Sequence, residues 1–537
     1  MNRKLKNWIM AVPAGVVAVL SFAVCAGLGI ASLFVLANMK TEEFAEHIPD
    51  ELVITARNVP HTLAGAAVAA AALVGVCVLA VRWLSWKNAR FFSILAAAGV
   101  TAFCFVWIGS FSSYPAVDQM DFWNTACFLA GRGELFDFEW EYLRLYPFQA
   151  ATAMAAEPLV RLFGTSWLSW EFLSACSAGV SVYILSCICG RLTDSPAAKC
   201  LCALLTASFV PLALYSTFVY GTLPGLALAL LGSYAVMREC AEAKSPVRWW
   251  ALAALSFAAA LILYSGEMIF LAAAVLVLFA TGVFCPGQRR KILAAVLLAA
   301  LAVGVSHLWQ EAAMTRLGMP GESGCPILPR ILMGVDAYSE KAMPGFYNGI
   351  SIKVYRQCGY DAAMANRQAA MDIRNSLLAL QRQGRFWQFF AEKTADQWLE
   401  PWFTSLSANN PSLYNEPRWL ARALTGGVLF APVQAWLGLL MPLVYLFGAA
   451  GILLAFAKHK TAVWRLTPMV CLIGGFLFQL ASEAKSRYCM PYYLCCFPMA
   501  AAGVAALAEK TAEKQRSDGK KQPNGEMKKW QNCKMLS

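Results

Sequence analysis

The stretch YPAVDQMDFW, residues 114–123, places two carboxylates beside aromatic side chains: Asp118 and Asp121 lie next to Phe122 and Trp123. A carboxylate that is partly shielded from water can act as a general base. If the stretch is helical, the spacing of three puts both carboxylates on one face. A solvated acidic loop, or Asp118 capping a helix, would explain the same residues without catalysis. We take Asp118 as the first candidate for a base and Asp121 as the second.

A second polar stretch, SEAKSRYCMPYY at residues 482–493, contains Glu483, Lys485, Arg487 and Tyr488 between two apolar runs. A guanidinium group can bind two phosphate oxygens at once. The stretch therefore predicts a phosphate site in which Arg487 is assisted by Lys485 and Tyr488. The alternative is that basic and tyrosine side chains simply reach the polar edge of a membrane, as they do without any function.

Two further loops carry candidates. Glu267, in YSGE at residues 264–267, follows Ser265 and Gly266 between two apolar runs and is another choice for a base or for orienting hydroxyl groups. The segment KTADQWLEPWF, residues 393–403, is rich in aromatic residues. Three of them could stack on a sugar or a lipid, or could instead form a protein core: Trp398, Trp402 and Phe403.

The composition determines where these loops lie. The chain has 537 residues, of which 59% are hydrophobic and 14% charged, whereas soluble proteins have roughly 25% charged residues. About 20 apolar residues in a helix span a bilayer, and twelve such segments recur along the chain. They cover residues 9–36, 62–81, 91–110, 167–190, 197–214, 219–237, 249–264, 267–285, 291–311, 428–457, 463–482 and 488–508. The predicted fold is an all-α polytopic membrane protein with about twelve transmembrane helices and an extracytoplasmic loop domain.

The basic residues predict the orientation. The net charge is +12, but Lys and Arg gather in short segments between spans and in the tail, as membrane topology requires, so no nucleic-acid partner is expected. With the N-terminus inside the cell, every short inside loop is basic and the first outside loop, residues 41–51, is acidic. Both termini are then cytoplasmic. The two polar stretches, the turn YSTFVYGT at 215–222 and the loop 312–427 all lie outside.

Other site types lack their motifs. The 18 cysteines and four histidines show no zinc spacing, and Cys325 and Cys358 share an outside loop, where they could form a disulfide or stay as free thiols. No metal site is predicted, although a divalent metal ion stays possible as a cofactor. There is no Gly-rich phosphate loop or nucleotide motif. An activated donor would therefore be lipid-linked.

The predicted organisation has five parts. They are an N-terminal transmembrane hairpin (1–90), a transmembrane core (91–311) with a catalytic first outside loop (111–166), an extracytoplasmic loop domain (312–427), C-terminal transmembrane helices (428–508) and a basic cytoplasmic tail (509–537).

The order of these motifs resembles the GT-C superfamily of polytopic glycosyltransferases, in particular the bacterial relatives of protein mannosyltransferases and aminoarabinose transferases. The resemblance spans about residues 91–508. Its elements are the acidic pair Asp118-Gln119, the pattern Ala126, Leu129 and Gly131, the YP.Q element of Tyr146, Pro147 and Gln149, the MG…G.YN and W.EP.F pieces of the long loop, and the E.K.RY..P element of Glu483, Lys485, Arg487, Tyr488 and Pro491.

The resemblance implies an enzyme of the bacterial plasma membrane, acting on its outer face. A sugar would pass from a polyprenyl-phosphate carrier to a glycan, lipid or protein acceptor with inversion. Asp118 would be the base and Arg487 would stabilise the departing phosphate. Four residues would bind substrate: Gln119, Tyr146, Gln149 and Trp398. The long loop would close over the reactants.

One feature departs from the family and two other functions compete. The catalytic loop usually follows the first span, whereas here it follows the third, so the role of the hairpin 9–81 is open. A polysaccharide polymerase or ligase would use a lipid-linked oligosaccharide instead. A lipid or solute transporter would place its ionisable groups near the middle of the bilayer and show internal repeats, and neither feature is evident here.

Overall fold

A computed structural model provides the structure of the chain. It describes residues 3–39, 52–111, 114–241, 247–285, 287–322, 324–341, 343–407, 419–458 and 463–521. The acidic loop 41–51 and the end of the basic tail, 522–537, lie outside the described residues.

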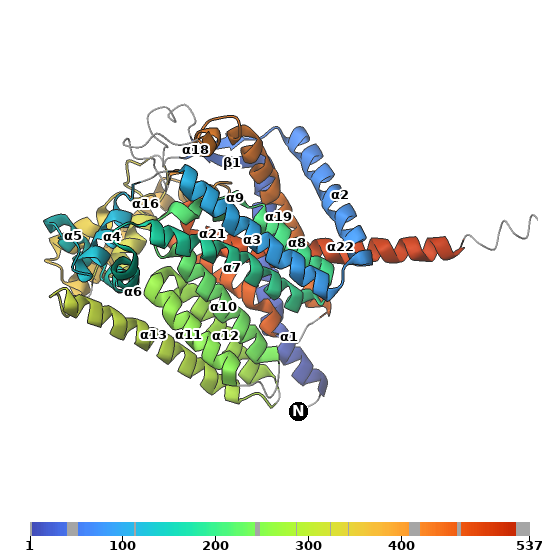
Figure 1. The fold of residues 1–537 in the computed structure, drawn as a ribbon, viewed down its shortest axis with the longest axis horizontal. Coiled ribbons are helices and arrows are strands. Elements are labelled where there is room, and N and C mark those ends of the chain that lie inside the picture. The colour runs from blue at the N-terminus through green and yellow to red at the C-terminus, as the bar shows by residue number, and fades with distance from the viewer. Residues whose placement is uncertain are drawn as a thin grey trace, which may run out of the picture.

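The chain is almost entirely helical (Figure 1). The helices up to the long loop are α1 (Arg3–Phe34), α2 (Val59–Trp83), α3 (Trp86–Ser110), α4 (Asp118–Leu129), α5 (Asp137–Leu145), α6 (Phe148–Phe163), α7 (Leu168–Thr193), α8 (Pro196–Ala207), α9 (Val210–Leu214), α10 (Thr222–Ala241), α11 (Val247–Leu263), α12 (Met268–Phe284) and α13 (Arg290–Arg316). After it come α14 (Ile327–Gly334), α15 (Ile350–Gln357), α16 (Ala362–Arg382), α17 (Phe386–Trp398), α18 (Trp419–Leu424), α19 (Phe430–Lys458), α20 (Thr467–Ala481), α21 (Met490–Leu494) and α22 (Cys496–Lys521).

The polytopic, all-helical class is confirmed, whereas the number of twelve spans is not. Within the described ranges, nine helices are long and apolar enough to cross a membrane, or ten if α8 and the following short helices, bent by 59°, form one broken span. Helix α11 covers a predicted span but is a shorter apolar helix. Helix α10 covers another and is not among the nine.

The first two helices belong to the main core. Helix α1 packs along α19, and α2 lies against α22. Between them, β1 (Val35–Met39) and β2 (Leu52–Ala56) form an antiparallel pair in which Val35 lies opposite Ala56. Arg57 then donates from Nη1 to the carbonyl oxygens of Ser32 (2.7 Å) and Gly438 (2.8 Å). The N-terminal hairpin is therefore bound to the C-terminal helices by packing and by a partly buried hydrogen bond from Arg57 to Gly438.

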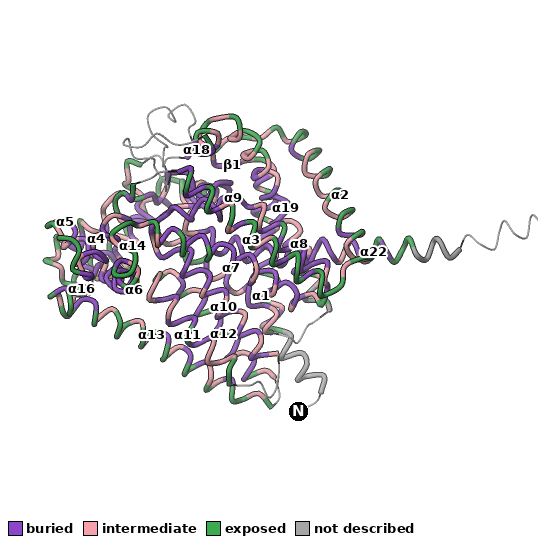
Figure 2. Tube along the Cα trace, in the orientation of Figure 1, coloured by how far each residue is buried: buried purple, intermediate pink, exposed green. Residues whose placement is uncertain are grey.

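The loops that carry the candidate residues gather at one end of the helices. Figure 1 shows α4, α5, α6 and α16 together at the end opposite to the N-terminus. Figure 2 shows how far each helix is buried. Among the nine candidate spans, 89% of the most apolar stretch is buried in the span that contains α22, against 11% in α2 and 17% in α13. Helix α22 is thus central, and α2 and α13 present most of their surface to the membrane.

Two glycines allow α19 and α22 to pack at backbone contact. A Cβ atom added at Gly451 would collide with the carbonyl oxygen of Met499, and one added at Gly503 would collide with that of Phe447. Close approach through small residues is a common way of packing transmembrane helices.

We predict that Gly451→Ala destabilises the protein by roughly 1–3 kcal/mol, because overpacking forces these backbones apart. Thermal unfolding in detergent micelles measures the change. Gly99→Ala on α3 is the matched control, since a Cβ atom there meets nothing within 4 Å. Equal unfolding midpoints for the two variants would contradict the proposed backbone contact.

Candidate active site

Helix α4 begins at Asp118 with a strained backbone. The preceding residue, Val117, has φ 53° and ψ −128°, a conformation that glycine tolerates and a β-branched residue rarely adopts. Asp118 is half-buried in the first turn, where the partial positive charge of a helix N-terminus interacts favourably with a carboxylate. The local backbone therefore presents this carboxylate at the start of a helix.

The first turn of α4 is tied to the loop between α9 and α10. The Oε1 atom of Gln119 accepts a hydrogen bond from the backbone N–H of Val219 at 2.8 Å, and Gln119 is buried. Gln119, which we predicted to bind substrate, thus links two loops of the site. Its contact also brings residues 218–220 beside Asp118.

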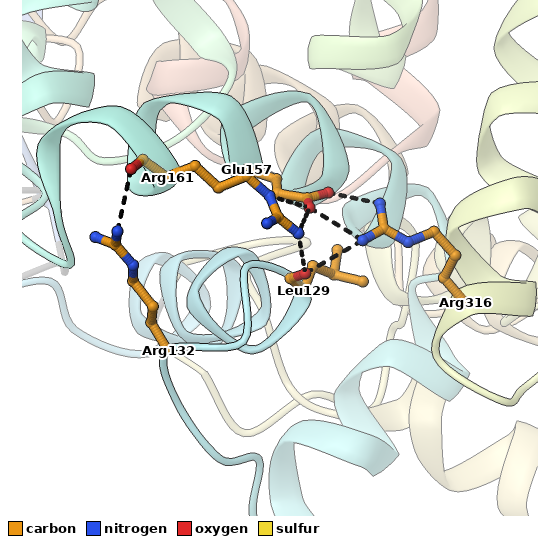
Figure 3. Close-up of polar contacts among 5 residues, drawn as sticks. All are labelled: Leu129, Arg132, Glu157, Arg161 and Arg316. Atoms are coloured by element: carbon orange, nitrogen blue, oxygen red, sulfur yellow. Dashed lines mark hydrogen bonds and ion pairs between the residues drawn. The ribbon is translucent and has the colours of Figure 1, made fainter.

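The far end of α4 is held by a group of arginines around Glu157 (Figure 3). Glu157 of α6 accepts hydrogen bonds from Arg161 at 2.7 Å and from Arg316 of α13 at 2.5 Å. Both arginines also donate to the carbonyl oxygen of Leu129, the last residue of α4, at 3.3 and 3.2 Å. Arg132 donates to the carbonyl oxygen of Arg161 at 3.1 Å. Helix α4 is therefore fixed at both ends.

A group of phenols lies next to Asp118. Tyr220 is hydrogen-bonded to Tyr142, and the side-chain amide of Gln149 also donates to the hydroxyl of Tyr220. Burial raises the pKa of Tyr220, and the negative charge of Asp118 raises it further. Tyr146 responds in the same way, since burial first and then other neighbours, Asp118 among them, raise its pKa. Tyr146 and Gln149 thus lie in the group of residues near Asp118, and their role in substrate binding stays a prediction.

Arg487 lies next to the same loop, at Phe218. Its Nη2 atom donates to the hydroxyl of Tyr488 at 3.0 Å, and its guanidinium lies 5.7 Å from the ring centre of Phe218. Its Nε atom is buried and has no hydrogen-bond partner among the described residues. Burial alone would lower the pKa of Arg487, but Tyr488, Glu483 and Asp118 raise it above its ordinary value. Arg487 and Gln119, the neighbour of Asp118, therefore contact the same loop.

A cavity opens beside Arg487. It is small, with a volume of about 10 Å³ for the centre of a water molecule. Its polar lining has two cations and three hydroxyl groups, and its apolar lining comes from β2 and the long loop: Lys485, Arg487, Thr404, Ser407, Ser486, Leu52, Met343 and Phe346. The Lys485 ammonium lies 5.1 Å from the ring centre of Phe346. Cations and hydroxyl donors around a small cavity suit an anionic oxygen group such as a phosphate.

Two predicted site residues, Glu267 and Trp398, are buried and do not line this cavity. Glu267 is 1% exposed, and neither carboxylate oxygen has a hydrogen-bond partner in the described part of the chain. Trp398 is fully buried, and its carbonyl oxygen accepts a hydrogen bond from Tyr445 at 3.0 Å. Trp402 and Phe403 are buried in the same core cluster as the membrane helices. These aromatics form core, so a stacking role for Trp398 has no support in this packing.

Sequence reasoning missed the phenols at the centre of the site. Tyr220 lies in the turn 215–222, which we placed on the outside without assigning it a role, and Tyr142 lies between the acidic pair and the YP.Q element. The available signal was the run of polar and aromatic residues in a short turn between two apolar spans. The contact of Gln119 with Val219 in the folded chain brings this turn to Asp118.

The disulfide and the metal ion find no support in the described residues. Cys325 and Cys358 are both free thiols. No group of three or more His, Cys, Asp or Glu residues in the described ranges is arranged to hold a metal ion.

Comparison with known proteins gives a partial structural likeness. No protein-family model and no curated protein matches the chain. Three solved structures of the oligosaccharyltransferase from Archaeoglobus fulgidus are similar to it. They are AglB in complex with an inhibitory peptide and a dolichol-phosphate (TM-score 0.40, 13% identity, 78% of this chain and 50% of that chain), the apo form (0.40, 12%, 78% and 50%), and the complex with zinc and sulfate (0.39, 14%, 77% and 48%). The chain spans about half the length of the structures it matches, so its function is argued from its own residues.

Asp121 differs from Asp118 in its surroundings. It is 8% exposed, and burial, with the charges of Asp118 and Glu139, raises its pKa from 3.8 to about 7. Glu139 is itself occupied, because its two oxygens accept from Asn124 Nδ2 and Phe136 N, each at 2.7 Å. Asp121 therefore keeps its proton up to neutral pH, and Asp118 is the more accessible carboxylate.

We predict that Asp121→Asn stabilises the protein more at pH 8 than at pH 5. Between pH 3.8 and about 7 the folded protein keeps a proton that the unfolded chain releases, so wild-type stability falls as the pH rises through this window and then levels off. Asparagine does not titrate and avoids this loss. Thermal unfolding at both pH values measures the difference. Asp137→Asn, at an exposed position of α5, should show no such pH dependence, and the same gain at both pH values for Asp121→Asn would contradict the raised pKa.

Proposed function

We propose that this chain is an integral membrane glycosyltransferase that transfers a sugar from a polyprenyl-phosphate donor to an acceptor hydroxyl. The observation that carries the proposal is the loop 218–220, which Gln119, the neighbour of Asp118, contacts at Val219 and which Arg487 contacts at Phe218, with Arg487 lining a cavity. A carboxylate and a cation held next to the same loop can act on the two partners of a displacement reaction.

Asp118 serves as the general base. The acceptor oxygen attacks the anomeric carbon while Asp118 takes its proton, which gives inversion at that carbon. The half-buried position of Asp118 at the start of α4 supports this role. Tyr142 and Tyr220 donate and accept hydrogen bonds beside it, and Tyr146 and Gln149 lie in the same group. These side chains orient the acceptor or the sugar hydroxyls.

Arg487 receives the leaving group. As the bond between the anomeric carbon and the phosphate oxygen breaks, the polyprenyl phosphate departs as an anion and needs no proton. The unpartnered Nε of Arg487 and the lining by Lys485 and Ser486 support binding of that phosphate. Tyr488 holds the guanidinium in place through its hydroxyl. Fixed cations that meet developing charge lower the activation free energy.

The membrane supplies the setting. The basic inside loops and the gathering of polar residues at one end of the helices support a site on the extracytoplasmic face of a bacterial plasma membrane, with both termini cytoplasmic. A lipid-linked donor is available there, whereas soluble nucleotide sugars are not. The acceptor is a glycan, a lipid or a protein that carries a hydroxyl group.

The proposal is tested with the purified protein in lipid vesicles. A panel of radiolabelled polyprenyl-phosphate monosaccharides is offered with membrane, glycan and protein acceptors, and transferred label is counted. Asp118→Asn should lower transfer about 10²–10⁴-fold, because the base is lost. Arg487→Ala should lower it about 10²–10³-fold, because the leaving phosphate loses its cation.

Asp137→Asn is the control, since it removes an exposed carboxylate from the same outside loop and should leave transfer unchanged. Full transfer by Asp118→Asn would contradict the assignment of the base. Transfer only from lipid-linked oligosaccharides would replace the monosaccharide transferase by a polymerase or ligase. Movement of the lipid across the vesicle without transfer would indicate a transporter.

A further inference from the structure

Three buried polar side chains on and just after α17 contact the segment before Arg487. Lys393 and Gln397 are four residues apart and so lie on one face of the helix, and Glu400 follows its C-terminal end. All three side chains are 0% exposed. A buried polar side chain must find a hydrogen-bond partner, or its burial costs free energy.

Each of the three has a partner among residues 479–486, and Glu400 also accepts from the backbone N–H groups of Trp402, at 2.8 Å, and Thr404. The Lys393 ammonium donates to the carbonyl oxygen of Ser482 at 2.6 Å, and also to that of Gly334. The Gln397 amide donates to the carbonyl oxygens of Gln479 (3.1 Å) and Glu483 (3.3 Å). Glu400 accepts from the hydroxyl of Ser486 at 2.9 Å.

Residues 482–485, the loop before Arg487, have no regular secondary structure to fix their backbone. They connect α20 to a short helical turn at 486–488, so their carbonyl groups have no regular ladder. A backbone contact from the long loop, Ala484 N to Gly345 O at 2.7 Å, adds to the side-chain contacts. Leaving a buried carbonyl oxygen without a donor costs about 1–3 kcal/mol.

Lys393 is an expensive residue for this position, which indicates that its contacts matter. Burial lowers its pKa to about 7, although nearby Cys489 and Glu483 favour the charged form. A methionine of similar length would avoid that cost but would leave two carbonyl oxygens unpaired.

We propose that Lys393, Gln397 and Glu400 are positioning residues: they hold the backbone of residues 479–486 so that Arg487 faces the donor phosphate. This inference rests on the proposed function for the role of Arg487 only. The long loop thereby becomes a fixed part of the phosphate site, because its helix α17 holds the residues that precede Arg487. The W.EP.F piece of that loop serves to place Glu400 opposite Ser486.

The first experiment follows the loop itself. Hydrogen exchange, read by mass spectrometry, is measured for a peptide covering residues 479–488 in the full-length protein in micelles. Lys393→Met and the near-isosteric Gln397→Met should speed exchange of this peptide by about tenfold or more, because buried hydrogen bonds are lost. Gln388→Ala, on the exposed side of α17, should change nothing. Unchanged exchange in both methionine variants would overturn the proposal.

The second experiment separates positioning from general stability. Binding of a polyprenyl phosphate without sugar is measured for each variant. Lys393→Met should weaken binding about tenfold, whereas Phe389→Ala, which removes a buried side chain of α17, should lower the unfolding midpoint without weakening binding. In an Arg487→Lys background, Lys393→Met should have a smaller effect, because coupled residues are not additive.

Two results would overturn the inference at this step. One is that Lys393→Met binds the polyprenyl phosphate as tightly as wild type does, although Arg487→Lys binds it more weakly. The other is full additivity of the two substitutions. If wild type itself does not bind the lipid phosphate, the proposed function fails, and the hydrogen-exchange result alone decides whether α17 holds the loop.

Discussion

The absence of water in the bilayer core is the constraint on which this structure depends. Every backbone N–H and C=O group inside must be paired within the protein, so regular helices cross the core and irregular backbone is tolerated only where protein buries it. Two such irregular segments, 215–221 and 482–488, lie among the helices. Each is paired by side chains: Trp170 donates to the carbonyl oxygen of Tyr220 at 3.0 Å, and Lys393 to that of Ser482 at 2.6 Å.

The same contacts that satisfy the backbone also position the candidate site. Gln119 is hydrogen-bonded to the first segment, next to Asp118. Lys393 of α17 is hydrogen-bonded to the second segment, shortly before Arg487. Backbone strain accompanies both. Val117 precedes Asp118, and Phe403 and Thr404, with φ values of 49° and 53°, lie beside the cavity. Each strained residue costs about 1–3 kcal/mol and persists only because its surroundings hold it.

The N-terminal hairpin completes the far wall of this arrangement. Ala37 of β1 donates to the carbonyl oxygen of Leu399 at 3.0 Å, just after α17, and Leu52 of β2 lines the cavity. Gln434 of α19 bridges the two regions, since it donates to Asn38 and accepts from the indole of Trp402. The first two helices, whose role the sequence left open, thus carry a strand pair that packs against the cavity beside Arg487.

The sequence by itself determined the helical membrane class, because the length of an apolar run is a local property that can be compared directly with the thickness of a bilayer. It also pointed to Asp118 and Arg487, since charged residues between apolar runs are costly and few. The tertiary structure alone decided that Gln119 joins two loops, that Trp398 is core, that Tyr142 and Tyr220 lie beside Asp118, and that Lys393 holds the loop before Arg487. Each of these depends on residues far apart in the chain, and which distant segments meet is set by how the helices pack rather than by any local pattern of residues.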